Sequence, residues 1–245
     1  MGEVALPART VLHRLDCRLG RKRTAKRSVA RVVRPPAAAP PLRRENSKAR
    51  ASHPAGTFAL IAYLRTVANS RTIHDSARFG LTIERLCRHL IEEHGDFADS
   101  CLIGIQTGGV QLAERLHHRL RELGVSDLPF GKLDITFYRD DFRTKAGPLT
   151  AHPTTINFLV EDKRVILVDD VLFSGRTVLS AMTALNHYGR PSAVELLVMV
   201  DRRFRRTLPV QANYRGLLVD SLTNEYVDVQ WRETHGTDQI LLLGS

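Results

Sequence analysis

Residues 165–177 read Val-Ile-Leu-Val-Asp-Asp-Val-Leu-Phe-Ser-Gly-Arg-Thr, and they carry the strongest structural signal in the sequence. Residues 165–168 form an uninterrupted run of aliphatic side chains, which predicts a strand buried on both faces of a parallel sheet. Asp169 and Asp170 follow this run directly. We therefore expect two carboxylates at the point where the strand leaves the sheet.

A loop of small residues and a helix follow the acidic pair. Ser174 and Gly175 mark the loop, apolar residues then recur at helical spacing over 178–185, and Gly189 is the expected C-terminal cap. Gly175 would let the backbone approach a phosphate, and the loop amides with the helix N-terminus would supply hydrogen-bond donors. Vicinal sugar hydroxyls can donate to the two carboxylates, directly or through Mg²⁺. The stretch thus indicates a phosphorylated, hydroxyl-bearing ligand.

An aliphatic strand that ends in acidic residues has two other interpretations, of which one remains open and the other is excluded. The acidic pair alone is equally consistent with a solvated strand end or a helix N-cap. A Walker B strand would need an upstream G-x-x-x-x-G-K-[ST] loop. The only Gly-Lys pair, Gly131-Lys132, is followed by Leu133, so that loop is absent from the sequence.

A second strand–turn–helix unit lies upstream. Residues 101–105 predict a short buried strand, and Gln106-Thr107-Gly108-Gly109 forms the turn after it. Leucines at helical spacing then continue to a stop at Gly124. A glycine turn alone is weak evidence, because many such turns carry glycine for geometry. Paired with the first unit, it could hold the second phosphorylated end of a sugar diphosphate.

The remaining elements predict a doubly wound, mostly parallel α/β sheet. We expect helices over 57–67 and 75–94, the second stopping at Gly95, and strands over 133–138, 193–200, 214–219, 225–229 and 239–243. Residues 142–163 lack a clear period and predict a lid or a disordered loop. Ligands of such sheets bind at the carboxyl ends of the strands. The segments expected there are 101–109, 139–141, 169–177 and 201–203.

The basic charge of the chain is concentrated in its first 52 residues. The chain has a net charge of +10, but residues 1–52 hold 14 Lys and Arg against 3 Asp and Glu, so the rest is close to neutral. This segment is also rich in Pro and Ala, and we expect it to be disordered. A transit peptide, a nucleic-acid-binding arm and a non-functional extension all remain open. Residues 53–72 would be a lead-in helix or linker, and 73–245 the folded domain.

The other compositional features indicate a reduced cytoplasmic protein. Cys17, Cys87 and Cys101 show no paired spacing, and the last two fall in expected core elements. No apolar stretch approaches the roughly 18 residues of a membrane span, so we expect no membrane partner. The histidines at 89, 94, 117 and 118 lack zinc-ligand spacing, and we expect them at the surface.

The 13 residues of 165–177 resemble the ribose-phosphate signature of type I phosphoribosyltransferases, which bind 5-phosphoribosyl 1-diphosphate. Within that group, residues 133–141 (Leu-Asp-Ile-Thr-Phe-Tyr-Arg-Asp-Asp), Val200-Asp201-Arg202 and Leu208-Pro209-Val210 are similar to the pyrimidine operon attenuator and uracil phosphoribosyltransferase family, PyrR. The resemblance covers about residues 73–245. It implies synthesis of UMP from uracil, UMP-dependent binding to the leader of pyrimidine mRNA, and homodimers that assemble further.

The resemblance also implies roles for individual residues. Asp169 and Asp170 would hold the ribose hydroxyls, with Mg²⁺ nearby, and Arg139 would close over the site. The turn 106–109 would face the diphosphate. The base pocket would lie near Asp201 and Arg202. The 5′-phosphate loop and its approach would consist of Val171, Leu172, Phe173, Ser174, Gly175, Arg176 and Thr177.

The chain departs from the family pattern at two places. The diphosphate turn of the family reads Lys-Thr-Arg-Gly, so Gln106 and Gly108 replace two cations, and Arg203 stands where the family has glycine. Loss of charged donors to the diphosphate predicts weak transferase activity with nucleotide binding retained. Two alternatives remain: a salvage phosphoribosyltransferase without an RNA role, and a protein whose basic arm binds nucleic acid without nucleotide control.

Overall fold

A computed structural model describes residues 70–140, 151–221 and 225–244. The chain divides into Met1–Ser52 and His53–Ser245, and every described residue belongs to the second unit. The predictions for residues 1–52 and for a helix over 57–67 therefore lie outside the described residues.

A five-stranded parallel sheet forms the centre of the described part, in the order β3-β2-β4-β5-β6. This order, with crossover helices between the strands, is the predicted doubly wound arrangement. The strands are β2 (Ser100–Ile105), β3 (Phe130–Leu133), β4 (Arg164–Leu172), β5 (Ala193–Arg202) and β6 (Tyr214–Val219).

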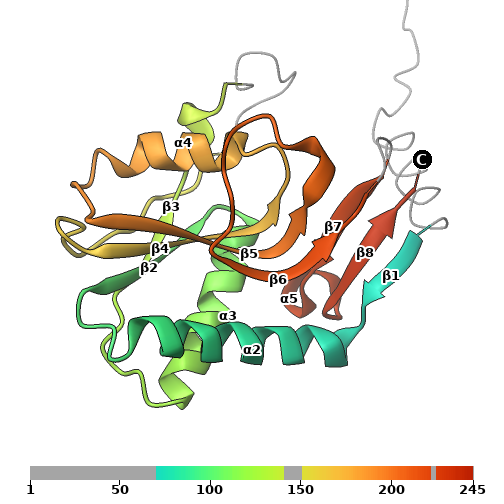
Figure 1. Ribbon diagram of the computed structural model, residues 1–245, viewed down its shortest axis with the longest axis horizontal. Helices are drawn as coiled ribbons and strands as arrows, with labels where there is room; N and C mark the ends of the chain where they lie inside the picture. The colour runs from blue at the N-terminus through green and yellow to red at the C-terminus, as the bar shows by residue number, and fades with distance from the viewer. Residues whose placement is uncertain (1–69, 141–150, 222–224, 245) are drawn as a thin grey trace, which may run out of the picture. The chain divides into compact units, whose positions relative to one another are not determined.

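Helices cover both faces of this sheet (Figure 1). On one face lie α2 (Ser76–His94) and α3 (Gly108–Glu122), and on the other lies α4 (Arg176–Leu185). Side chains alternate between the faces along each strand: Ile166 and Val168 pack toward α2 and α3, whereas Val165 and Leu167 pack toward α4. Because both faces are covered, the central strands are apolar throughout, as the sequence predicted.

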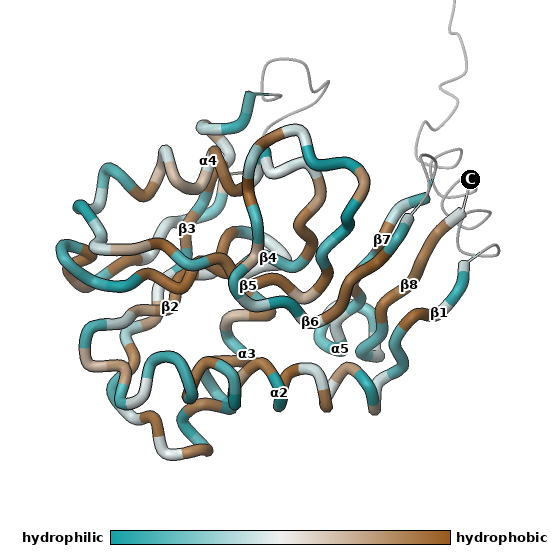
Figure 2. The backbone as a smooth tube through the Cα atoms, in the orientation of Figure 1, coloured by the Kyte–Doolittle hydropathy of each residue, from teal (hydrophilic) through white to brown (hydrophobic). Residues whose placement is uncertain are grey.

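A smaller antiparallel sheet adjoins the site end of the central sheet. It has the order β1-β8-β7, formed by β1 (Ser70–His74), β8 (Gln239–Leu243) and β7 (Tyr226–Gln230), with the short helix α5 (Arg232–His235) before β8. Figure 2 shows hydrophobic stretches along β7 and β8 and an alternation of hydrophobic and hydrophilic residues along α2. Arg115 of α3 ties the two parts together, since its guanidinium contacts Glu233 and Asp238 at 2.6 Å each.

The strand predicted over 133–138 is wrong. β3 ends at Leu133, and residues Thr136–Tyr138 form a 3-10 turn. The Asp134 carboxylate accepts hydrogen bonds from the backbone N–H of Thr136 at 3.2 Å and from its hydroxyl at 2.7 Å. A hydrogen bond between an Asp side chain and the backbone two residues later stabilises a turn. The alternation of apolar residues over 133–138 gave no sign of this turn.

Two other boundaries differ from the sequence prediction. α4 ends at Leu185 with Asn186 as its C-cap, and Gly189 lies in the turn beyond it with a φ of 136°. Of the segment 142–163, residues 151–163 are described and the remainder is not. Thr155 pairs with Lys132 beside β3, and Val160 is fully buried against the α4 face. This described part is therefore packed against the sheet.

One predicted surface histidine is buried, because it belongs to a polar network at the amino end of the sheet. His94 hydrogen-bonds Ser100 through Nδ1 at 2.8 Å and the hydroxyl of Tyr214 through Nε2 at 3.0 Å. Tyr214 donates to Glu195 at 2.6 Å, and Arg164 donates to the other carboxylate oxygen. Burial lowers the pKa of His94, with a contribution from Arg164, so the neutral imidazole is favoured.

The two described cysteines are buried, as predicted. Burial raises the pKa of the Cys87 thiol to about 12 and that of Cys101 to about 11, which keeps both thiols protonated and unreactive. None of the helices in the described ranges has the length and apolar character needed to cross a membrane.

Candidate functional site

The carboxyl ends of the parallel strands bring the predicted site segments to one edge of the sheet. β4 continues past the end of β2: Gly104 pairs with Val168, while Asp169, Val171 and Leu172 pair with β5 alone. The expectation that the strand leaves the sheet at Asp169 is thus wrong by four residues. The extension leaves one side of β4 without a neighbouring strand at the acidic pair, which is where the cleft opens.

Asp169 and Asp170 differ in exposure and in the cavities they line. Asp169 is 6% exposed and lines two adjoining cavities, whereas Asp170 is half-buried and lines only the second. Burial, reinforced by the neighbouring Asp170 charge, raises the pKa of Asp169 well above the usual aspartate value. Burial also raises the pKa of Asp170, although the N–H of Val171 donates to its carboxylate at 2.8 Å. Buried, perturbed carboxylates in a cleft are typical of functional sites.

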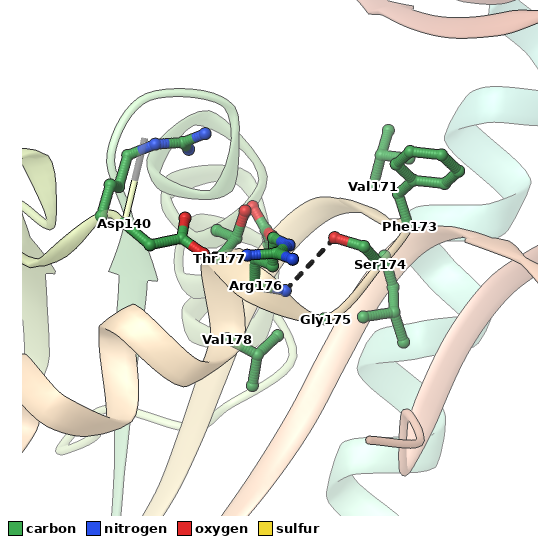
Figure 3. A pocket seen from close by; sticks show the side chains of 11 residues that line it. Asp140, Val171, Phe173, Ser174, Gly175, Arg176, Thr177 and Val178 are labelled. Atoms are coloured by element: carbon green, nitrogen blue, oxygen red, sulfur yellow. Dashed lines mark hydrogen bonds and ion pairs between the residues drawn. The ribbon is translucent and has the colours of Figure 1, made fainter. Parts of the chain in front are cut away.

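The first cavity, of about 450 Å³, is formed by the loop between β4 and α4. Gly175 is the N-cap of α4 with a φ of 93°, a left-handed conformation that favours glycine. The backbone N–H of Arg176 faces the Ser174 hydroxyl at 3.4 Å, as the dashed line in Figure 3 shows. Loop amides and the first turn of a helix thus line one hollow, which is the arrangement that binds phosphate.

Other segments hold the loop between β4 and α4 from outside. Arg139 and Asp140 line the same cavity. Asp140 forms an ion pair with Arg176 (Figure 3). Behind the loop, the backbone N–H groups of residues 207 and 208 donate to the Ser174 carbonyl at 3.1 and 3.2 Å. Arg206 donates to the Phe173 carbonyl at 2.8 Å. The loop shape is therefore fixed by contacts that do not require a ligand.

Gln106, Thr107 and Gly108 of the turn 106–109 line the second cavity, which has a volume of about 440 Å³. The turn lies close to β4, because a Cβ on Gly109 would be 2.3 Å from the Val168 carbonyl oxygen and a Cβ on Gly108 would be 2.0 Å from Asp170 Oδ2. Glycine at both positions thus permits the turn to approach the acidic pair. Both cavities fall within the 300–1,000 Å³ typical of small-molecule sites.

The two residues predicted for the base pocket face different cavities. Arg202 is buried in the second cavity: its guanidinium lies 4.2 Å from the centre of the Phe173 ring and donates to Ser221 and to the carbonyl of Glu225, each at 2.7 Å. Asp201 instead lines a separate hollow with Arg203 and Arg206 and forms an ion pair with Arg206. Neighbouring residues of a strand point to opposite faces, which explains the separation.

Sequence reasoning missed the contribution of β7. Tyr226 and Asp228 line the second cavity together with Gln106, Thr107 and Gly108. They belong to the smaller sheet, so the sequence carried only a weak signal, a polar residue at every second position of a short strand. In the described part of the chain, no three His, Cys, Asp or Glu side chains gather in a way that would hold a metal ion by themselves.

Comparisons with known proteins agree with this geometry. Residues 69–233 match the family described as "Phosphoribosyl transferase domain". The chain is 42% identical over 168 residues to the "Bifunctional protein PyrR" of Desulfosudis oleivorans, covering 69% of this chain and 93% of that protein. It is 41% identical over 175 residues to the protein of the same name from Deinococcus radiodurans, covering 71% and 95%.

Solved structures show the same fold at low sequence identity. A hypoxanthine phosphoribosyltransferase from Staphylococcus aureus aligns with a TM-score of 0.53 and 17% identity, over 71% of this chain and 92% of that one. The hypoxanthine phosphoribosyltransferase of Trypanosoma cruzi aligns with a TM-score of 0.52 and 14% identity, over 71% and 96%. With this fold, and with the sequence match to relatives over nearly their whole length, the chain belongs to the phosphoribosyl transferase domain family and, within it, to the PyrR proteins.

Proposed function

We propose that the protein is a PyrR-type regulator that binds UMP in the cleft and, with UMP bound, binds the leader of pyrimidine biosynthesis mRNA to attenuate transcription. The observation that carries this proposal is the identity of about 40% with proteins named "Bifunctional protein PyrR" over more than nine-tenths of their length. The cavities at the ends of β4 and β5 support it, because together they suit a ligand with a phosphate, a sugar and a base.

The two cavities suggest how UMP lies in the cleft. The loop Phe173–Thr177 and the N-terminus of α4 receive the 5′-phosphate. Asp169, which lines both cavities, accepts hydrogen bonds from the ribose hydroxyls between them. The base enters the second cavity, between Tyr226 and the Phe173–Arg202 pair.

The same cleft would make UMP from uracil and 5-phosphoribosyl 1-diphosphate, but slowly. Displacement at the ribosyl carbon passes through a cation-like centre, so the protein contributes positioning and stabilisation of the leaving diphosphate. Gln106 and Gly108 offer no cation to that diphosphate. Each missing charged donor costs about 3 kcal/mol in the transition state, or roughly 10² in rate.

Mg²⁺ fits this site only together with its ligand. Mg²⁺ in such sites takes one or two carboxylates plus substrate phosphates and water, and Asp169 with Asp170 can supply the carboxylates. When bound, the ion would neutralise part of the diphosphate charge. We further propose a homodimer or larger homo-oligomer, which sedimentation of the purified protein would measure.

Binding of the leader transcript, measured with and without UMP, tests the proposed function. We expect UMP to tighten RNA binding and uracil alone to have no effect. Substantial UMP synthesis combined with RNA binding that does not respond to UMP would instead identify a salvage transferase. RNA binding that is lost on deletion of residues 1–52 and does not change with UMP would show that only the basic arm binds nucleic acid.

A further inference from the structure

The first two carbonyl groups of the loop between β4 and α4 are held by the segment that follows β5. Phe173 and Ser174 are the first residues after β4 (Figure 3). The guanidinium of Arg206 donates to the Phe173 carbonyl through Nη1 at 2.8 Å. The Ser174 carbonyl accepts from the backbone N–H groups of Thr207 and Leu208 at 3.1 and 3.2 Å. The Phe173 contact therefore depends on one side chain, whereas the Ser174 contacts are largely made by the backbone.

The orientation of the Phe173 carbonyl decides where the next amide points. A trans peptide group is planar, and its N–H and C=O point in opposite directions. With the Phe173 carbonyl turned toward Arg206, the N–H of Ser174 is turned away from Arg206. Arg206 does not line the first cavity, so it acts from behind the loop. A flip of this peptide would place a carbonyl oxygen, which repels a phosphate, where an N–H donor would bind it.

The carboxylate of Asp201 in turn fixes Arg206. Asp201 is a buried residue of β5. It forms an ion pair with Nη2 of the guanidinium whose Nη1 donates to Phe173. Arg215 lies farther from the carboxylate, at 4.0 Å. The guanidinium thus connects the central sheet to the loop, in a planar fork that a lysine ammonium does not reproduce.

This pair lies outside the cavity assigned to the base. Arg202 and Phe173 line the second cavity, whereas Asp201 and Arg206 line a separate hollow of about 660 Å³. The base-pocket role expected for Asp201 therefore has no supporting contact in the structure. A substitution in the pair should reach the ligand through the loop between β4 and α4, which is the loop that would receive the phosphate.

We propose that Asp201 and Arg206 are positioning residues for the 5′-phosphate, which hold the Phe173–Ser174 peptide in the orientation that presents its N–H to the phosphate. This inference rests on the proposed function and adds to it the residues that set the shape of the phosphate site. Asp201 acts through Arg206, Arg206 acts through the Phe173 carbonyl, and neither side chain touches the ligand.

Three substitutions and one control test the pair. Arg206→Ala removes the guanidinium, and Arg206→Lys keeps its positive charge without the fork. Asp201→Asn keeps the size of the side chain and removes its charge. Arg205→Ala is the matched control, because Arg205 is an exposed residue of the 3-10 turn Arg203–Arg205 and lines neither the hollow nor the two cavities of the cleft. It loses the same charge one residue away.

The test is isothermal titration of each variant with UMP and with uridine, which has the same ribose and base but no phosphate. Where uridine binds weakly, its affinity is measured by displacement of UMP. The readout is the ratio of the two dissociation constants. We expect both Arg206 variants to weaken UMP binding by about tenfold, the order of one hydrogen bond to a charged group, and to leave uridine binding unchanged. We expect wild-type affinities for both ligands in Arg205→Ala.

A double-mutant cycle tests whether Asp201 acts through Arg206. We expect Asp201→Asn to weaken UMP binding in the wild-type background and to have no further effect when residue 206 is alanine, because residues that act as one unit are not additive. The double variant lacks the buried carboxylate as well as the guanidinium, so it avoids the unpaired charge that could unfold Arg206→Ala. It should show the same change in the ratio of UMP to uridine affinity.

The opposite results are distinguishable from a failure of the proposed function. Equal weakening of UMP and uridine would indicate general damage to the cleft, and wild-type UMP affinity in Arg206→Lys would show that the fork is not needed. Additive effects of the two substitutions would mean that Asp201 acts independently of Arg206. Each of these results refutes the pair while UMP binding by the wild type stands. A wild-type protein that binds no UMP would refute the proposed function and this inference with it.

Discussion

Replacing Gly109 with alanine should destabilise the fold at the point where α3 meets β4. The added Cβ would lie 2.3 Å from the Val168 carbonyl oxygen and 3.0 Å from the Asp169 Cα, both backbone atoms of a central strand. Ordinary contact begins near 3.4 Å, so the start of α3 must move away from β4 by about 1 Å. Overpacking of this kind costs about 3 kcal/mol.

The helix propensity of alanine offsets part of this cost. Alanine is favoured over glycine in a helix by about 1 kcal/mol, which leaves a net loss of about 2 kcal/mol for Gly109→Ala. Gly80→Ala, which meets no atom within 4 Å, gains about 1 kcal/mol without a penalty. For a domain of this size we expect the Tm to fall by about 4–8 °C in the first variant and to rise by about 2–4 °C in the second.

Differential scanning calorimetry of the two variants beside the wild type measures this difference. UMP affinity supplies a second readout, because moving the turn away from β4 enlarges the second cavity beside Asp169. We expect weaker UMP binding in Gly109→Ala and unchanged binding in Gly80→Ala. Equal stability of the two variants would refute the close approach of α3 to β4 on which the geometry of the cleft depends.

Three further predictions address pH, catalysis and the basic segment. Because burial lowers the pKa of His94, the His94 side chain takes up a proton at higher pH in the unfolded state than in the folded state. The free energy of unfolding should therefore fall as the pH drops below about 6.5, by about 1.4 kcal/mol per pH unit, until His94 of the folded protein is also protonated. Hydrogen bonds from Tyr214 and Arg164 lower the pKa of Glu195 against the effect of burial, so the stability that Glu195 contributes is lost only at pH values below the usual glutamate pKa. Urea denaturation at several pH values measures both effects, and His94→Gln should abolish the loss of stability that begins below about pH 6.5 while leaving the Glu195 effect unchanged. Gln106→Lys should raise the kcat of UMP synthesis by up to about 10² with little change in UMP affinity. Gln111→Lys, which adds the same charge to α3 outside the cleft, should leave the kcat unchanged. A wild-type kcat of about 10 s⁻¹ would show that the lost cation does not matter. Deletion of residues 1–52 should preserve the Tm and UMP affinity but weaken salt-sensitive RNA binding, and a large fall in Tm would show that the segment belongs to the folded domain.

The sequence predicted the central part of the fold because its signals there are local. The aliphatic run before Asp169 and the helical period after Gly175 depend on burial of one strand and one helix face. They correctly predicted that β4, the loop and α4 follow one another, although β4 ends four residues later than expected and α4 is capped by Asn186. The alternation over 133–138 failed because a local bond from Asp134 to Thr136 competes with strand formation, and apolar periodicity does not report such bonds.

The parts of the site that the sequence did not predict depend on tertiary geometry. Arg202 and Asp201 separate because β5 continues through both residues, a boundary that the sequence placed earlier. Tyr226 reaches the cleft only because a second sheet adjoins the first, and no local pattern encodes that placement. The contact of Gly108 with Asp170 requires the register of β2 against β4, so the sequence showed a lost cation but not the carboxylate beside it.

Titration of UMP into the wild type and into Asp169→Asn tests most directly the claim that the nucleotide binds at the end of β4. Asparagine keeps the shape of the buried side chain, so the variant should retain the wild-type Tm. Loss of a charged hydrogen-bond acceptor for the ribose costs about 1.5–3 kcal/mol, which corresponds to roughly 10- to 100-fold in affinity. We predict saturable UMP binding to the wild type and a loss of that order in the variant. Equal UMP affinity in a folded Asp169→Asn protein would contradict the account, because the ligand would then bind elsewhere.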